Sequence, residues 1–150
     1  MHYNRNIWRF TIGSNGCVNT GHSSRIQTYS WQWSYGMDHH PSNELILYGS
    51  DWRGQRLTRV QMNPQRNGTF QIRNVGRYGQ TASKTGNVRM YGPWGVTVDK
   101  TNNRVLVTTY YKQSVQAFDL NLNFDKEFGG SHGTRMTGAH EAIQSIVTDS

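Results

Sequence analysis

Histidines are the side chains of this sequence best suited to chemistry, and their spacing decides what they could do. His39 and His40 follow Asp38 directly and precede Pro41. A zinc site needs three or four donors that converge on one point, and no further donor stands at a ligand spacing from this pair. The pattern therefore predicts a turn at these residues and no metal site.

The remaining candidates for catalysis are scattered. His22, His132 and His140 lie in expected loops, with Asp51 and Glu141 as possible neighbours. Loops on one side of a fold can converge, so a metal held there stays an alternative, although the spacing does not require one. The sequence has no glycine-rich phosphate loop, no nucleophile elbow and no carboxylate pair placed for acid–base work. We expect no catalytic residues, no metal and no cofactor, and hence no enzyme.

Aromatic and basic residues alternate in segments expected to lie on one rim of the fold. These segments are 50–55, 76–93, 109–113 and 129–142. Such residues can stack on unpaired bases while neutralising phosphates, and the same types are enriched at protein interfaces. The predicted binding residues, for protein or for RNA, are Trp52, Arg53, Arg77, Tyr78, Lys84, Arg89, Tyr91, Tyr110, Tyr111, Lys112, His132 and Arg135.

The positive charge is concentrated in the middle of the chain. The net charge is +7, and residues 51–99 carry eight cations, seven of them Arg, against two acids. Guanidinium groups suit phosphate, carboxylate or aromatic partners because they are flat, forked and permanently charged. A solvated strand face would explain the same pattern, and the two interpretations have about equal weight.

Composition limits the fold class. The chain has 150 residues, 34% of them hydrophobic and 12% aromatic, which is typical of one ordered domain with many short strands. The single cysteine excludes an internal disulfide. No apolar run approaches the length of a membrane span, and the first ten residues lack a signal-peptide core. We expect an intracellular protein without membrane contact.

The expected strands fall into two similar sets of four, separated by tight turns. They are residues 34–38, 44–48, 55–62 and 69–75, and then 95–98, 104–109, 114–118 and 123–128. Superposing the sets places Trp33 on Trp94, Asp38 on Asp99 and Gly76 on Gly129. A four-stranded unit that recurs with matched residues is an internal repeat, and β-propellers are built of such blades. We expect Trp33, Trp94, Phe118 and Phe128 to belong to the structural core.

One segment of the second unit resembles a known repeat. The sequence GPWGVTVDKTNNRVLVTTYYKQSVQAFDLNLNFDKEFGG, residues 92–130, is similar to a blade of the NHL-repeat type. Such blades run Pro-x-Gly-hydrophobic-x-hydrophobic-Asp, a turn, a hydrophobic strand, an x-Val-Gln-x-Phe strand and a hairpin that ends in Phe-Gly. The resemblance is weaker over residues 33–79, where the Pro-x-Gly is absent. It implies a β-propeller and, because propellers of this type bind RNA on a basic face, raises the RNA hypothesis.

The expected organisation is an all-β, incomplete β-propeller. Residues 1–30 would form outer strands of a partial blade, 31–79 and 91–130 two whole blades, and 142–150 the first strand of another. Propellers usually close with four to eight blades. Either several copies of the chain close the ring, or the rest of the propeller is a different chain or was not included. We expect other chains, or copies of this one, to complete the propeller.

Three functions are compatible with this organisation. The leading hypothesis is a non-catalytic scaffold or interaction module that acts as a subunit of a larger assembly. The alternative is single-stranded RNA binding through the basic, aromatic face. A propeller enzyme with a metal on its axis is the third, and the sequence offers it the least support.

Overall fold

The structure is a computed structural model, and it describes residues 6–27, 35–62, 72–76, 90 and 92–129. All regular elements among these residues are strands, so the expected all-β fold class is confirmed. In this part of the chain no helix could cross a membrane. The strands are β1 (Asn6–Ile12), β2 (Val18–Gln27), β3 (Met37–His40), β4 (Asn43–Asp51), β5 (Arg56–Gln61), β6 (Ile72–Gly76), β7 (Pro93–Asp99), β8 (Arg104–Thr109), β9 (Ser114–Asp119) and β10 (Phe124–Gly129).

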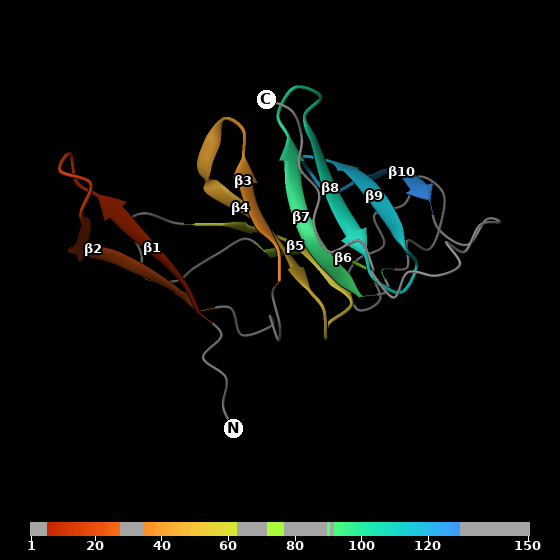
Figure 1. Ribbon diagram of the computed structural model, residues 1–150, viewed down its shortest axis with the longest axis horizontal. Helices are drawn as coiled ribbons and strands as arrows, with labels where there is room; N and C mark the ends of the chain where they lie inside the picture. The colour runs from red at the N-terminus through yellow and green to blue at the C-terminus, as the bar shows by residue number, and fades with distance from the viewer. Residues whose placement is uncertain (1–5, 28–34, 63–71, 77–89, 91, 130–150) are drawn as a thin grey trace.

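Eight of these strands form two four-stranded antiparallel sheets. The first sheet has the order β3-β4-β5-β6 and the second the order β7-β8-β9-β10, so each strand pairs with its neighbours in the sequence. Short connections between consecutive strands permit this antiparallel order directly. Figure 1 shows the two sheets side by side, with the hairpin β1–β2 at one end. The expected pair of four-stranded antiparallel units is therefore confirmed.

The hairpin β1–β2 is a separate two-stranded sheet. Its turn contains the GSNG segment, residues 13–16, in which the N–H of Gly13 donates to the carbonyl of Cys17 over 2.8 Å. The side chain of Asn15 accepts the N–H of Cys17 over 3.0 Å. Assignment of this hairpin to the outer strands of a partial blade stays a prediction.

The two four-stranded sheets repeat the same loop between their second and third strands. The loops span residues 51–56 and 109–114, and the end residues of each pair with one another across the strands. Gln55 and Gln113 occupy the same place, with φ of 53° and 52°. Each donates its N–H to the carbonyl three residues earlier. This match aligns the sheets at their second and third strands.

A second match aligns the first strands. The N–H of Gly36 donates to the hydroxyl of Ser50 over 3.1 Å, and the N–H of Gly95 donates to the hydroxyl of Thr108 over 2.8 Å. Ser50 and Thr108 both stand one residue before the aligned loop. Gly36 therefore occupies the place of Gly95.

The expected superposition of Asp38 on Asp99 is wrong. Asp38 lies opposite Tyr48, which stands three residues before the first loop. The residue three before the second loop is Leu106, and Thr97 lies opposite it. Asp38 therefore corresponds to Thr97 and not to Asp99. The cause is the turn after each first strand, which spans residues 41–42 in one sheet and 100–103 in the other. Because the turns differ in length, aligning the two aspartates that precede them places the first strands of the two sheets out of register.

A hydrophobic core joins the two sheets. Tyr48 of β4 and Phe118 of β9 are its largest members, and both are fully buried. Strand alternation explains the arrangement, because every second residue of a strand faces the same side. The buried core residues are Ile46, Tyr48, Leu57, Val75, Met90, Val96, Val98, Val105, Val107, Phe118 and Leu122.

Two hydrogen bonds connect polar side chains of the first sheet to the backbone of the second. The hydroxyl of Tyr48 donates to the carbonyl of Leu120 over 2.8 Å, and the hydroxyl of Ser50 donates to the carbonyl of Trp94 over 2.6 Å. A buried hydroxyl without a partner would cost free energy. These bonds therefore fix the relative position of the sheets while they satisfy the buried groups.

A carboxylate completes the contact at the edge of the second sheet. β7 is an edge strand, so the backbone groups on its free side need partners outside the sheet. The carboxylate of Asp38 accepts the N–H of Val98 over 2.8 Å and the hydroxyl of Thr97 over 3.4 Å. Asp38 thus joins β3 to β7 where no backbone ladder does.

The four predicted core aromatics have different outcomes. Phe118 is fully buried, as predicted, whereas Phe128 is wrong as a core residue because 47% of its surface is exposed. A register shift that begins at Phe124 puts an extra residue into β10, and such a bulge moves the following side chains to the opposite face. Trp94 is only half-buried, and Trp33 lies outside the described residues.

Gly76 and Gly129 end the fourth strand of each sheet in a left-handed conformation, with φ of 127° and 72°. A Cβ atom on Gly76 would overlap the carbonyl oxygen of Gln55, and one on Gly129 would come within 3.1 Å of the carbonyl oxygen of Gln113. The predicted match of these two glycines is confirmed, and it reflects a close approach of two backbones that leaves no room for a side chain.

Gly76→Ala is expected to lower the free energy of unfolding by about 3 kcal/mol, because it combines an unfavourable φ with a backbone overlap. Gly16→Ala is the matched control, since Gly16 has φ of 76° and no atom within 4 Å of the added Cβ. We expect the control to cost about 1 kcal/mol. Urea unfolding monitored by tryptophan fluorescence measures both, and equal costs would contradict the steric explanation.

Candidate functional site

The candidate site is a rim formed where the loops of the two sheets meet. The backbone of Gly92, directly before β7, joins them. Its N–H donates to the side-chain carbonyl of Gln55 over 2.8 Å, and its carbonyl accepts the N–H of Tyr110 over 2.7 Å. The β4–β5 loop, the β8–β9 loop and the start of β7 therefore lie on one side of the molecule, as the sequence predicts.

Five aromatic rings lie in contact along this rim, and we call them the ring array. Tyr35 stacks on Trp94 with 3.9 Å between centroids and 9° between planes. Trp94 contacts Tyr110 at 5.7 Å, Tyr110 meets Tyr111 edge-on at 5.2 Å, and Tyr111 contacts Trp52 at 5.7 Å. The order Tyr35–Trp94–Tyr110–Tyr111–Trp52 thus runs across the boundary between the two sheets.

The ends and the middle of the array differ in exposure. Tyr35 and Tyr111 are 47% and 61% exposed, whereas Trp52, Trp94 and Tyr110 are half-buried. Aromatic pairs in tilted and stacked arrangements stabilise one another by about 0.5–1.5 kcal/mol beyond the area they bury. The half-buried rings therefore hold the two exposed rings in fixed orientations, and the exposed rings can contact a ligand.

Glycine at position 92 allows the rings to approach the backbone. Its φ is 66°, and a Cβ atom there would lie 3.0–3.1 Å from Tyr111, Trp52 and Tyr110. These distances are shorter than ordinary van der Waals contact, so any side chain at this position would displace the array. Gly92 therefore sets the position of the rim aromatics as well as the hydrogen bonds beneath them.

A buried ion pair supports the first rim loop. The carboxylate of Asp51 is fully buried and accepts from the guanidinium of Arg56 over 2.8 and 3.0 Å. Its other oxygen accepts the N–H of Gly54 over 2.8 Å. The acid and the base close the loop from its two ends, and both charges are engaged within the protein.

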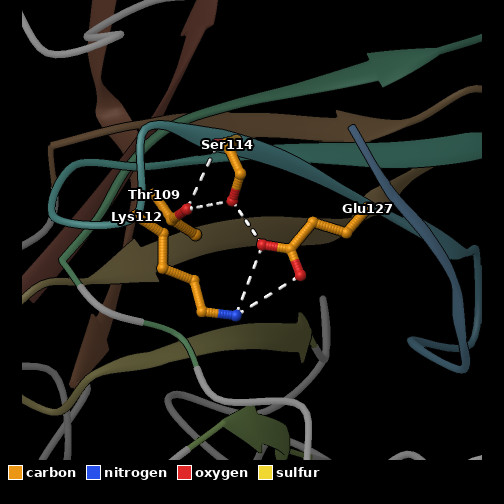
Figure 2. A network of polar contacts seen from close by, with 4 residues as sticks. All are labelled: Thr109, Lys112, Ser114 and Glu127. Carbon is orange, nitrogen blue, oxygen red and sulfur yellow. Dashed lines mark hydrogen bonds and ion pairs between the residues drawn. The ribbon is translucent and has the colours of Figure 1, made fainter. Parts of the chain in front are cut away.

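The second rim loop is closed at the same place by a different network, shown in Figure 2. The buried hydroxyls of Thr109 and Ser114 lie 2.7 Å apart, and Ser114 donates to the carboxylate of Glu127 in β10. The ammonium of Lys112 lies 3.3 Å from both oxygens of that carboxylate. Ser114 and Thr109 occupy the places of Arg56 and Asp51, so the network is a structural substitute for the ion pair.

The histidine pair ends β3, and the predicted turn follows it at residues 41–42 instead of including it. The backbone N–H of Ser42 donates to Nδ1 of His40 over 3.2 Å. Burial, and then the positive charge of Arg59, hold the pKa of His40 below its usual value, which keeps the ring neutral and able to accept. His39 lies 3.2 Å from the carboxylate of Asp38. In the described ranges no three His, Cys, Asp or Glu side chains are grouped for a metal.

The predicted binding residues divide into two groups. Trp52, Tyr110 and Tyr111 belong to the ring array, while Arg53 and Lys112 lie in the same loops. The other predicted binding residues, Arg77, Tyr78, Lys84, Arg89, Tyr91, His132 and Arg135, lie outside the described part of the chain.

Sequence reasoning missed two members of the array. The sequence pattern assigns Trp94 to the core and does not distinguish Tyr35. Both stand immediately before a matched glycine, Gly36 or Gly95, so an alignment on the glycines would have found them. The alignment on Trp33 hid the correspondence between Tyr35 and Trp94.

Comparison with solved structures identifies the architecture. The chain is similar to a functionally unknown protein from Desulfotomaculum acetoxidans, with a TM-score of 0.55, 19% identity and coverage of 83% of this chain and 35% of that one. It is also similar to virginiamycin B lyase from Staphylococcus aureus, with a TM-score of 0.53, 14% identity and coverage of 87% and 36%. The two four-stranded sheets resemble β-propeller blades.

A third similar structure is a putative 6-phosphogluconolactonase from Bacteroides uniformis, with a TM-score of 0.56, 13% identity and coverage of 88% of this chain and 42% of that one. The chain thus spans between about a third and two fifths of these structures. At such identities the similarity establishes the fold alone. No protein-family model and no curated protein matches the sequence.

The two loop closures give a testable contrast. Asp51→Ala removes a fully buried carboxylate from Arg56 and from Gly54, and we expect it to lower the free energy of unfolding by about 3 kcal/mol. Lys112→Ala breaks a partly exposed pair with Glu127 and should cost about 0.5 kcal/mol. Urea unfolding of the two variants measures the difference. If Lys112→Ala lowered the free energy of unfolding as much as Asp51→Ala, the Lys112–Glu127 pair would not be the weaker of the two loop closures, and this account would be contradicted.

Proposed function

We propose that the chain is a non-catalytic β-propeller interaction module whose ring array contacts a protein partner. The observation that carries the proposal is the array itself: two exposed tyrosines held by three half-buried rings across the boundary between two blades. Tyrosine and tryptophan side chains supply much of the binding energy at protein interfaces. Because the rings are fixed before binding, little conformational entropy is lost when a partner is contacted.

The charges near the array favour a protein over a nucleic acid. The ion pairs Asp51–Arg56 and Lys112–Glu127 neutralise two of the cations of the rim. Arg53 is exposed, and within the described ranges no ion pair of its own is seen. RNA binding depends on several cations that neutralise phosphates. In the part of the rim that the structure describes, one exposed arginine lies beside five rings, and this part suits a largely uncharged contact better.

The engaged polar groups support a role without catalysis. Asp51 is occupied by Arg56 and Gly54, and the hydroxyl of Ser114 by Glu127. A general acid, base or nucleophile needs access to a substrate, whereas these groups close loops and are largely buried. Their arrangement is that of a scaffold for the rim.

We further propose that the blades are of the NHL-repeat type and that other chains or copies of this one complete the propeller. The resemblance of residues 92–130 to that repeat supports the first point, and so does the equivalence of Gly36 with Gly95, which extends the glycine of the Pro-x-Gly pattern to the first blade. The second point is supported by the coverage, since the chain spans 35–42% of similar propeller structures.

The proposal is tested with the double variant Tyr35→Ser/Tyr111→Ser, which removes the two exposed rings. Wild-type chain is immobilised and exposed to a lysate of the source organism, with and without ribonuclease, and the bound proteins are quantified. Each ring should contribute about 2 kcal/mol, so the variant should bind its partner about a thousandfold more weakly. We expect the captured proteins to be lost with the variant and kept after ribonuclease treatment.

Val18→Ser is the control, because Val18 is a 54% exposed apolar residue at the hairpin and away from the rim. It should capture the same proteins as the wild type. A labelled single-stranded RNA provides the second arm, measured at low and at moderate salt. Strong, salt-dependent RNA binding that the tyrosine double variant abolishes would overturn the protein hypothesis in favour of the nucleic-acid alternative.

A further inference from the structure

The two rim loops each carry an exposed residue at the same place. Counted from the last residue of β4 and of β8, the third residue is Arg53 in the first loop and Tyr111 in the second. Arg53 is exposed, and Tyr111 is exposed to 61%. The residue before each of them, Trp52 or Tyr110, is half-buried and belongs to the ring array. The repeated loop backbone therefore presents one cation and one ring to solvent at matching positions.

Arg53 adjoins the ring array. It directly follows Trp52, whose ring contacts that of Tyr111 with 5.7 Å between centroids and 45° between planes. The most exposed ring of the array therefore contacts the residue that precedes the cation. A partner that covers Tyr111 and Trp52 also comes beside Arg53, and tryptophan, tyrosine and arginine are the residue types enriched among those that dominate binding energy at protein interfaces.

The cation of the second loop is neutralised within the protein, as Figure 2 shows. The ammonium of Lys112 lies 3.3 Å from both carboxylate oxygens of Glu127. Glu127 pairs across the strands with Gln116, the third residue of β9. The third residue of β5 is Thr58, and it pairs with Asn74. An uncharged residue therefore stands in the first sheet where the second sheet has its acid.

The acid of the first loop is engaged by a different base. Asp51 is fully buried and accepts from Arg56 over 2.8 and 3.0 Å and from the N–H of Gly54 over 2.8 Å. A Cβ atom on Gly54 would overlap this carboxylate and the guanidinium of Arg56, so the ion pair fills the space inside the loop. Among the described residues Arg53 has no ion pair, and its charge is available to a partner.

We propose that Arg53 selects the partner of the ring array by pairing with a carboxylate, so that the partner segment is a peptide with an aspartate or glutamate beside the group that covers the rings. The inference rests on the proposed function, because it assigns the chemistry of the same contact. A guanidinium is planar and forked, and it matches both oxygens of a carboxylate. Paired charges at an interface determine which partner binds more than how tightly it binds.

The charge of the protein favours a carboxylate as the paired group. The chain has a net charge of +7, which attracts acidic partners and repels basic ones. In the described part of the rim one exposed arginine balances one carboxylate, whereas a phosphorylated side chain carries about two negative charges. The exposed cation and rings therefore suit an acidic peptide better than a phosphopeptide.

Selection of short random peptides, displayed on phage, on the immobilised full chain identifies the partner chemistry. The wild type should select peptides with aspartate or glutamate beside an aromatic residue or proline. Arg53→Gln should lose the preference for acids and keep that for aromatic residues, and Arg53→Glu should select lysine or arginine instead. The double variant Tyr35→Ser/Tyr111→Ser should lose the preference for aromatic residues and proline.

One selected peptide is then synthesised with its acid kept, changed to the matching amide, or changed to phosphoserine, and binding is followed by tryptophan fluorescence. The amide peptide should bind the wild type about fivefold more weakly, the effect of one ion pair that is partly exposed to water. Arg53→Gln should bind the acid and amide peptides equally, because the pair is then already lost. The difference seen with the wild type should shrink at high salt, and phosphoserine should bind no more tightly than the acid.

Lys100→Gln is the matched control. Lys100 is an exposed cation in the turn before β8, at the end of that strand away from the rim, and its variant loses the same charge as Arg53→Gln. It should retain the preference and the affinity of the wild type. An equal loss in Lys100→Gln, tighter binding of phosphoserine, or a wild type that selects no peptide would overturn the inference.

The selection also separates failure of this inference from failure of the proposed function. Peptides that lack acids but still require Tyr35 and Tyr111 would overturn the role of Arg53 and leave the binding role of the ring array intact. Peptides that bind without either tyrosine would contradict both.

Discussion

The packing of one sheet on the next is the interaction on which the rest of the structure depends. Four valines of β7 and β8 are buried against Tyr48, Leu57 and other apolar residues of the first sheet. Isolated sheets of this size have two faces to cover, and here each sheet covers a face of the other. Hydrogen bonds from Tyr48, Ser50 and Asp38 fix how the sheets meet, so the hydrophobic contact is also a specific one. The geometry of the rim depends on this contact, because the ring array contains residues next to both sheets. The hydrogen bonds of Gly92 connect the loops that carry these residues.

The two equivalent rim loops are closed by different side chains. The first rim loop is closed by a buried acid and base, whereas the second is closed by two hydroxyls and a carboxylate of the neighbouring strand. Backbone features are kept more closely than side chains, since the left-handed glutamines and terminal glycines recur in both sheets. The rim can therefore vary in chemistry while the blades retain their shape. This freedom separates what the protein contacts from how it folds, and it is why the fold alone does not assign a function.

Much of the fold could be predicted from local patterns. Alternating and β-branched runs bounded by turn residues indicate eight strands in two sets of four. The correspondence of Gly76 with Gly129 could also be predicted from the sequence. The register of β3 could not be predicted, because Asp38 and Asp99 precede turns of different length. The exposure of Phe128 was missed for a similar reason, since a bulge in β10 leaves no mark in the alternation. At the rim, proximity of the two loops followed from the repeat, but the stack of Tyr35 on Trp94 depends on three-dimensional packing.

Hydrogen exchange at the backbone amide of Val98 tests the central claim most directly. This N–H lies at the edge of the second sheet and is bonded to the carboxylate of Asp38 in the first. If the two sheets pack as blades, the amide should be protected as strongly as the ladder amides of the core, and Asp38→Ala should remove that protection while leaving the β8–β9 ladder protected. Rapid exchange of Val98 in the wild-type protein, with the ladder of its own sheet intact, would contradict the account.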